Sequence, residues 1–285
     1  MKKMKTKIKP ILKNIFLASI VLTMAMYWYD QGAYYFTNEY DFTYKENWCL
    51  ETGNVAVINI YGEIATYSPE SYYDKEQGQT FPTTVSSEDV VYYINEAEND
   101  EYIEAIIVTI DSYGGYPVAS EEIMNALKRT TKPTIAVIRE GAVSGGYLIA
   151  SGADKIYASE MSDVGSIGIT MSYLDYSQQN KQEGIIYQQL SSGKFKDTGD
   201  PDKTLTAEEK ELFMRDIKIL HEAFVKRVAE NRGLDIEEVE KLADGSTMLG
   251  RAAKENGLID EIGDIEDAKN WLRNEFQIEP ELCFY

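Results

Sequence analysis

The chain of 285 residues is 44% apolar and 27% charged, a composition that predicts a globular protein with a sizeable core and excludes wholesale disorder. It contains one histidine, His221, and two cysteines, Cys49 and Cys283. These counts exclude cysteine and histidine zinc sites, disulfide frameworks and iron-sulfur clusters, so we expect no metal and no cofactor, although carboxylates alone could hold an ion. Because histidine is so scarce, a catalytic serine or cysteine would need another base unless His221 itself lies in the site.

The net charge of −20 is distributed unevenly along the chain. Residues 1–14 contain six lysines and no acidic residue, which leaves 28 − 6 = 22 basic against 48 acidic residues, or −26, for the remainder. Such an acidic body repels phosphate backbones, so we do not expect nucleic acid as a partner.

Residues 15–29 follow the lysines, carry no charge and end in the run Tyr-Trp-Tyr. This order predicts a single-pass anchor in the cell membrane behind a cytoplasmic segment, 1–14, with the chain from Asp30 onward on the outer, periplasmic or extracytoplasmic, side. Fifteen residues are fewer than the roughly 20 that cross a bilayer, and a signal peptide cleaved after Ala25 is the alternative. We favour the uncleaved anchor, since aromatic residues suit a membrane interface better than a cleavage site.

After a polar linker at 30–53, we expect one catalytic domain at 54–285. Apolar runs predict strands at 55–60, 105–110, 134–138, 155–158, 167–171 and 185–190. The segments between them predict helices at 87–99, 118–128, 145–151 and 173–182, and a long polar loop or lid at 62–84. This alternation predicts an α/β fold whose parallel sheet is flanked by helices on both faces.

The last third of the chain is predicted to be mostly helical. Thr206 and Glu209 form a capping box pattern, and an apolar stripe follows it up to Gly233, made of Phe213, Ile217, Leu220, Phe224 and Val228. His221 lies off this stripe, so we expect it to face solvent.

Two glycine-rich segments follow predicted strands. In Asp-Ser-Tyr-Gly-Gly, residues 111–115, the paired glycines would let backbone N–H groups turn towards an oxyanion, although an ordinary turn is the alternative. In Gly-Ala-Val-Ser-Gly-Gly-Tyr, residues 141–147, Ser144 would stand at the start of a helix. There the helix dipole and the Gly145 N–H favour an alkoxide or an oxyanion, whereas a plain helix cap is the alternative.

A third segment, residues 191–197, supplies Lys194 and Lys196 after the last predicted strand. A lysine can replace histidine as a general base where burial or nearby positive charge lowers its pKa. Two solvated surface lysines are the alternative. No single segment decides between catalysis and ordinary structure.

Together with the Gly-Ser-Ile-Gly segment at 165–168 and the segment at 257–263, these motifs resemble the signal peptide peptidase A family of serine peptidases, which has a Clp protease/crotonase-like fold. The resemblance spans about residues 54–268. It implies that Ser144 is the nucleophile and Lys196 the general base, with Lys194 the lesser candidate. The family's first glycine turn more typically reads Asn-Ser-Pro-Gly-Gly, so this chain departs from the pattern at two positions of that turn.

The same resemblance assigns the remaining site residues. An oxyanion hole would combine the N–H of Gly145 with one from the pair Gly114 and Gly115. The substrate would bind against the Gly-Ser-Ile-Gly segment, made of Gly165, Ser166, Ile167 and Gly168, and would extend beside residues 167–171.

The implied function is that of a membrane-anchored serine endopeptidase without metal or cofactor, which degrades remnant signal peptides or other membrane-released peptides. The resemblance further implies a homo-oligomeric ring in which neighbouring chains share each site. Two alternatives stay open, a crotonase-like acyl-CoA enzyme and a catalytically inactive membrane scaffold that binds peptides. The pairing of Cys49 with Cys283 and two free thiols are equally compatible with the sequence.

Overall fold

The computed structural model describes residues 53–67, 71–74, 79–82 and 84–285. The basic segment 1–14, the expected anchor 15–29 and the linker up to residue 52 lie outside these residues. No helix in the described part of the chain is long and apolar enough to cross a membrane. The described residues belong to one compact unit, Cys49–Tyr285.

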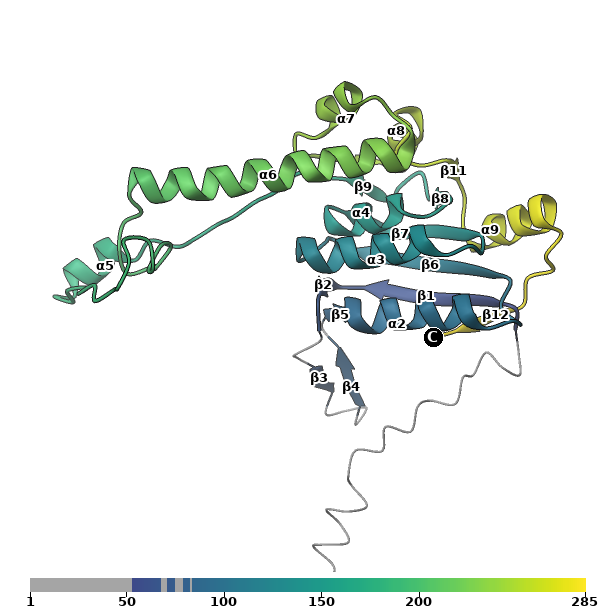
Figure 1. Cartoon of the computed structure of the whole chain (residues 1–285), viewed down its shortest axis with the longest axis horizontal. Helices are drawn as coiled ribbons and strands as arrows, with labels where there is room; N and C mark the ends of the chain where they lie inside the picture. The colour runs from purple at the N-terminus through teal and green to yellow at the C-terminus, as the bar shows by residue number, and fades with distance from the viewer. Residues whose placement is uncertain (1–52, 68–70, 75–78, 83) are drawn as a thin grey trace, which may run out of the picture. The chain divides into compact units, whose positions relative to one another are not determined.

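A sheet of eight strands forms the centre of this unit (Figure 1). Its main path runs β10-β9-β7-β6-β1-β12, and β8 pairs with both β7 and β11. Every pairing is parallel except that of β10 with β9, so the predicted parallel sheet is confirmed. The strands are β1 Val55–Tyr61, β6 Ala105–Ser112, β7 Thr134–Val143, β8 Lys155–Ala158, β9 Asp163–Gly165, β10 Thr247–Leu249, β11 Glu261–Ile262 and β12 Leu282–Phe284.

Helices cover both faces of the sheet, as Figure 1 shows. Alternate side chains of β1 face opposite ways: Ile58 and Ile60 join a large core with α2, α3 and α4, whereas Val57 joins a smaller core with α9 and η2. Because both faces are buried, the strands are continuous apolar runs, which made them predictable. These helices are α2 Ser87–Asn99, α3 Pro117–Arg129, α4 Gly145–Ser151, α9 Ile265–Trp271 and the π-helix η2 Leu272–Phe276.

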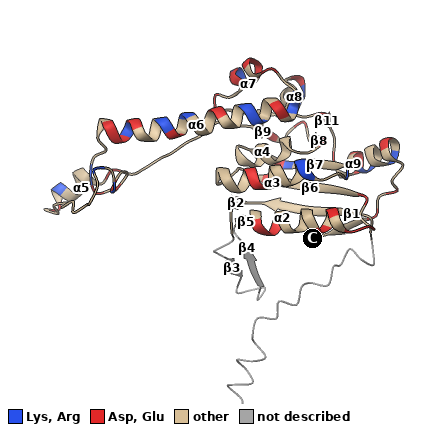
Figure 2. Cartoon of the chain, viewed as in Figure 1, with Lys and Arg blue, Asp and Glu red and all other residues tan. Residues whose placement is uncertain are grey.

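The long helix α6, Ala207–Arg232, begins at the predicted capping box and ends at Gly233, whose φ of 63° stops the helix in the left-handed conformation. Only its second half reaches the core, through Phe224 and Val228. Side chains of both charges alternate along α6, whereas most of the sheet is uncharged (Figure 2). Two short helices follow, α7 Ile236–Leu242 and α8 Gly250–Glu255.

Several predictions for the middle of the chain were wrong. Residues 167–171 and 185–190 form no strand, and the helix expected at 173–182 is shortened to α5, Ser177–Gln182. The strand lies earlier, at β9, because Ser166 has a φ of 50° and turns the chain out of the extended conformation. Residues 167–171 pass from the buried Ile167 to exposed positions at 170 and 171, residues 185–190 are largely exposed, and neither run pairs with a strand in the described part of the chain.

Three further predictions concern the segment 62–84, His221 and the cysteines. The polar excursion at 62–84 is not a plain loop, since it contains β2 Glu63–Ala65 paired in parallel with β5 Thr84–Ser86, and the hairpin β3 Ser71–Asp74 with β4 Gln79–Pro82. These short strands lack the continuous apolar runs by which the buried strands of the main sheet can be predicted.

His221 does not face solvent freely, because it is half-buried and its Nε2 lies 3.0 Å from the Ala243 carbonyl oxygen. Cys283 is disulfide-bonded, and the other cysteine of the chain, Cys49, lies outside the described residues.

Candidate active site

Ser144 occupies a strained turn between β7 and α4. Its φ of 53° and ψ of −120° are unusual for a residue with a side chain; such strain costs roughly 1–3 kcal/mol and persists only where the surrounding structure enforces it. The Ser144 N–H donates to the Gly165 carbonyl over 2.8 Å, and the Ser144 carbonyl accepts from Leu148 N over 3.0 Å. The hydroxyl makes no cap hydrogen bond, so the reading of Ser144 as a plain helix cap is wrong. No hydrogen bond joins this hydroxyl to another described residue, and a strained serine between a strand and a helix is the arrangement known from nucleophilic serines of other hydrolases.

The turn before α3 packs directly against this serine. Gly114 has a φ of 103°, and a Cβ there would lie 2.9 Å from Gly145 N and 3.0 Å from Ser144 Cβ. A Cβ on Gly145 would in turn overlap the Ser120 hydroxyl, and one on Gly115 would overlap the Ile64 carbonyl. The two turns therefore interlock in a way that only glycine permits.

The backbone N–H groups of the two turns can be accounted for one by one. Gly114 N donates to Ser112 Oγ over 3.1 Å, and the ladder with β2 uses the bonds Ile64 N to Gly114 O and Tyr116 N to Ile64 O. Because successive N–H groups of an extended chain point to opposite sides, the Gly115 N–H faces away from β2. It lies 3.4 Å from the position of a Cβ on Gly145, and the Gly145 N–H opens α4 without an intrahelical acceptor.

The Gly-Ser-Ile-Gly segment lies beside the Ser144 turn. Gly165 accepts the hydrogen bond from Ser144, and Ser166 is tied to the β10 side by its N–H to Ser246 O at 2.9 Å and its hydroxyl to Gly245 O at 2.8 Å. Ile167 is fully buried. Consecutive positive φ values at Gly165 and Ser166 hold this segment in a bend beside Ser144.

Both candidate lysines are exposed and lie in the turn 193–199. Lys194 forms an ion pair with Glu208 at 2.5 Å, and its ammonium lies 5.1 Å from the centre of the Phe195 ring. Lys196 donates its backbone N–H to Gly193 O over 3.2 Å. Its ammonium makes no hydrogen bond or ion pair with any part of the chain that the structure describes.

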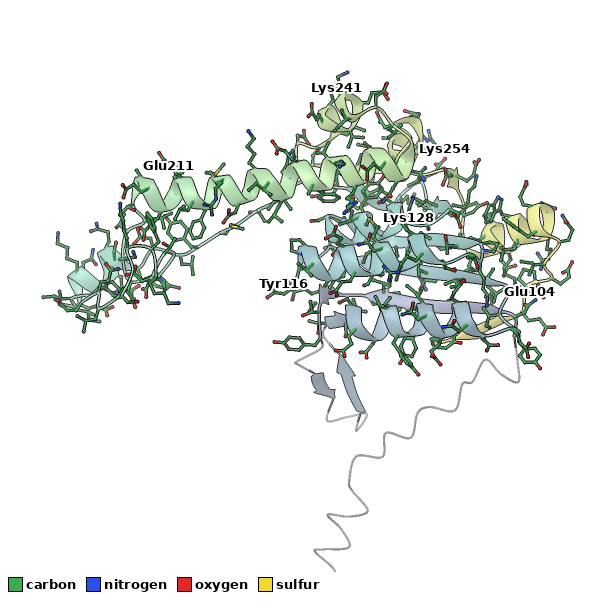
Figure 3. All side chains as sticks on the ribbon, viewed as in Figure 1. Glu104, Tyr116, Lys128, Glu211, Lys241 and Lys254 are labelled. Atoms are coloured by element: carbon green, nitrogen blue, oxygen red, sulfur yellow. The ribbon has the colours of Figure 1, made fainter. Side chains whose placement is uncertain are left out.

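The structure does not bring Lys196 and Ser144 together within one chain. The turn with Lys196 is fixed to the first turn of α6, where Lys194 meets Glu208. The far end of α6 meets the sheet-covering helices, because Arg227 pairs with Glu121 of α3 at 2.9 Å. Arg227 lies 227 − 208 = 19 helical positions after Glu208, a span of about 28 Å. Figure 3 labels Glu211 on the half of α6 away from the sheet and Tyr116 at the end of the sheet where α3 begins.

Buried groups behind the nucleophile turn keep it rigid. Tyr147 is fully buried, its hydroxyl donates to Leu258 O over 2.9 Å, and burial raises the pKa of that phenol. Ser112 and Ser120, which the sequence did not single out, support the glycine turns; Ser112 donates to Gly62 O over 2.6 Å. Their only clue in the sequence was proximity to the glycine pair.

Two other features of the described residues lie apart from this site. A hollow of about 490 Å³ is lined by none of the residues discussed above, but by Thr66, Ser87, Glu88, Val91, Glu122, Asn125 and Arg129. The described residues contain no group of three or more histidine, cysteine or acidic side chains that could hold a metal ion.

The chain is similar to several known proteins. The model of peptidase family S49 matches residues 126–279. A protein of Methanocaldococcus jannaschii named as a protease is 36% identical over 76% of this chain and 71% of its own length. A protein of Enterococcus faecium named as signal peptide peptidase SppA is 30% identical over 78% of this chain, which spans 63% of that relative. Among solved structures, a ClpP1 mutant from Listeria monocytogenes is 19% identical, with a TM-score of 0.47 over 74% of this chain and 92% of its own.

Proposed function

The chain belongs to peptidase family S49, and from this premise we propose that it is a serine endopeptidase with Ser144 as nucleophile and Lys196 as general base. The observation that carries the proposal is the strained turn at Ser144, which is held against two backbone N–H groups. A serine needs an adjacent base to be nucleophilic, and Lys196 is the exposed, unpaired lysine of the matching motif. Lys194 fits less well, because Glu208 holds its ammonium.

The proposed reaction uses no cofactor. The Ser144 hydroxyl attacks the peptide carbonyl while its proton passes to Lys196, and the N–H groups of Gly115 and Gly145 stabilise the oxyanion. Lys196 then protonates the leaving amine, and water hydrolyses the acyl-enzyme. Of the predicted donors we favour Gly115 over Gly114, whose N–H is already bound to Ser112.

We propose that Lys196 serves the Ser144 of a neighbouring copy. This explains why α6 separates the two residues within a chain. Residues 170–223, which we term the arm, contain a single buried residue, Glu209. Many large apolar side chains of the arm are exposed, namely Met171, Tyr173, Leu174, Tyr176, Ile185, Ile186, Leu190, Phe195, Met214 and Ile219. So many exposed apolar side chains indicate a surface that another chain covers. A head-to-tail arrangement of copies closes into a ring when its rotation allows.

The proposed setting is the outer face of the cell membrane, with residues 15–29 as the anchor and the basic segment 1–14 in the cytoplasm. Peptides released from the membrane, such as signal peptide remnants, would then be substrates. The support is the charge pattern of the N-terminus and the Enterococcus relative named as a signal peptide peptidase. The substrate would lie extended along Gly165 to Gly168, beside the nucleophile.

Covalent labelling tests this proposal directly. A fluorophosphonate probe should modify Ser144 in the detergent-solubilised full-length protein, and Ser144→Ala should abolish the label. Lys196→Ala and Lys196→Arg should both lose peptidase activity, because guanidinium stays protonated at any working pH, while the control His221→Ala should keep it. An unlabelled wild-type serine would favour the acyl-CoA enzyme or the inactive scaffold, and an active Lys196→Arg enzyme would exclude the dyad.

A further inference from the structure

The arm is held together by a buried charge. Glu209 is 2% exposed, and its Oε1 accepts from the Lys203 ammonium at 2.5 Å. Its Oε2 accepts from the N–H and the hydroxyl of Thr206, each at 2.9 Å. These bonds, that of Lys203 first, lower the pKa of Glu209 to about 2, so the carboxylate stays ionised at any working pH.

The Lys203 ammonium also contacts Asp197, the residue that follows the proposed base Lys196. Lys203 Nζ donates to Asp197 Oδ1 over 3.2 Å, and the side chains of Lys203 and Asp197 are only 18% and 12% exposed. Asp197 also accepts from the Tyr187 hydroxyl at 2.9 Å and from Gln189 Nε2 at 2.7 Å. Three side chains, those of Tyr187, Gln189 and Lys203, therefore bind the carboxylate of Asp197, the residue that follows Lys196.

We propose that Lys203, Asp197 and Glu209 form an ionic clamp that positions Lys196 for proton transfer, an inference that rests on the proposed role of Lys196 as the base. Within the described part of the chain, the Lys196 ammonium makes no hydrogen bond or ion pair that could fix it in the arm. Its backbone is fixed instead through Asp197, which the clamp ties to the first turn of α6. Lys203, Asp197 and Glu209 touch neither Ser144 nor Lys196 Nζ, so they act as positioning residues.

The clamp takes the place of an apolar core. Many large apolar side chains of the arm are exposed, and charge-assisted hydrogen bonds tie the turn 193–199 to the first turn of α6. Removing one partner of a buried ion pair leaves the other charge without compensation. Release of Asp197 would let Lys196 shift by an ångström or more, and a shift of that size can lower a rate about 100-fold.

A lysine series tests the clamp in the full-length assembled protein. Lys203→Met should lower kcat by about 10- to 100-fold with KM changed less than about threefold, since substrate binds beside Ser144 and not on the arm. Lys203→Arg should restore kcat to within a few-fold, because guanidinium can reach both carboxylates. The matched control is Lys218→Met on α6, whose ammonium makes, among the described residues, only an exposed pair with Glu222 at 3.7 Å. It should leave kcat unchanged.

The outcomes separate this inference from the proposed function. If Lys196→Ala is inactive but Lys203→Met keeps wild-type kcat, the clamp is wrong and the dyad stands. If Lys196→Ala itself is active, the proposed base is wrong. Circular dichroism and oligomer mass must match the wild type for Lys203→Met; if that variant does not fold, Asp197→Asn takes its place, and a wild-type kcat there overturns the clamp. A loss carried by KM alone also contradicts positioning.

Discussion

The sheet body and the arm are built on opposite principles. In the body, the Ser144 turn is enclosed by glycine contacts, a fully buried tyrosine and a continuous apolar core. In the arm, the buried residue is a carboxylate and the large apolar side chains face outward. In the proposed site, the body therefore positions Ser144 by close packing, whereas the arm would position Lys196 by charged contacts and present its apolar surface to a neighbouring copy.

The largest effect is expected from mixing two inactive variants. Ser144→Ala and Lys196→Ala should each lack peptidase activity alone. Co-assembled at equal amounts, they should regain about a quarter of wild-type sites, because a productive site then needs an intact serine from one chain and an intact lysine from its neighbour. Mass measurement of tagged chains checks that mixed assemblies form. Background activity in confirmed mixtures would show that body and arm of the same chain make the site.

The second-largest effect is expected in the stability of two glycine-to-alanine variants, one in the body and one in the arm. A Cβ at Gly115 would overlap the backbone oxygen of Ile64, which cannot rotate away, so Gly115→Ala should lower the free energy of unfolding by about 3 kcal/mol. Nothing lies within 4 Å of a Cβ at Gly193, so Gly193→Ala should change stability by less than about 0.5 kcal/mol. Urea unfolding of both variants measures the difference. Equal costs would contradict the claim that only the body is closely packed.

The elements of the sheet body could be predicted from the sequence more accurately than those of the arm. The strands at β1 and β6, and the helices α2 and α4, were predicted almost to the residue because burial on both faces imposes apolar runs and glycine turns. The apolar runs at 167–171 and 185–190 were mistaken for strands. Hydrophobicity reports that a side chain will be covered, but it does not say whether the same chain or another one covers it.

The residues of the candidate site in the body could also be predicted better than those in the arm. The motifs correctly grouped Ser144, Gly145 and the glycine pair, because each follows a neighbouring parallel strand and such ends meet at one edge of the sheet. Nothing in the sequence revealed that α6 separates Lys196 from them, since a spacing of 52 positions fits either arrangement. The clamp was visible only as the capping box at Glu209, because its other bonds join residues scattered between positions 187 and 209.

A smaller effect is expected in the pH dependence of stability, through the carboxylate of Glu209 in the arm. Hydrogen bonds from Lys203 and Thr206 lower the pKa of Glu209 to about 2, from an ordinary value of 4.5. A depressed carboxyl pKa stabilises the fold above about pH 4.5, and this stabilisation is lost as the pH falls through about 2. The urea midpoint of Glu209→Gln should therefore lie below that of the wild type at pH 6, and the gap should narrow at pH 3. A gap that widens as the pH falls would refute the ionic pairing of Glu209.

The smallest effect on folding is expected from the outward apolar side chains of the arm. Leu190 is 98% exposed and Ile186 is 76% exposed, so Leu190→Ser and Ile186→Ser should each change the unfolding free energy of the isolated chain by less than about 0.5 kcal/mol. If these residues meet a neighbouring copy, the same substitutions should nevertheless weaken assembly, because each leaves apolar surface of the partner in water. Analytical ultracentrifugation across a dilution series separates the two quantities. Lys181→Ser, an exposed change on α5 in the same arm, serves as the control for a merely altered surface. Unchanged assembly in both apolar variants would mean that this part of the arm stays exposed in the ring, and the contact with the neighbouring copy would then have to be sought on the first half of α6.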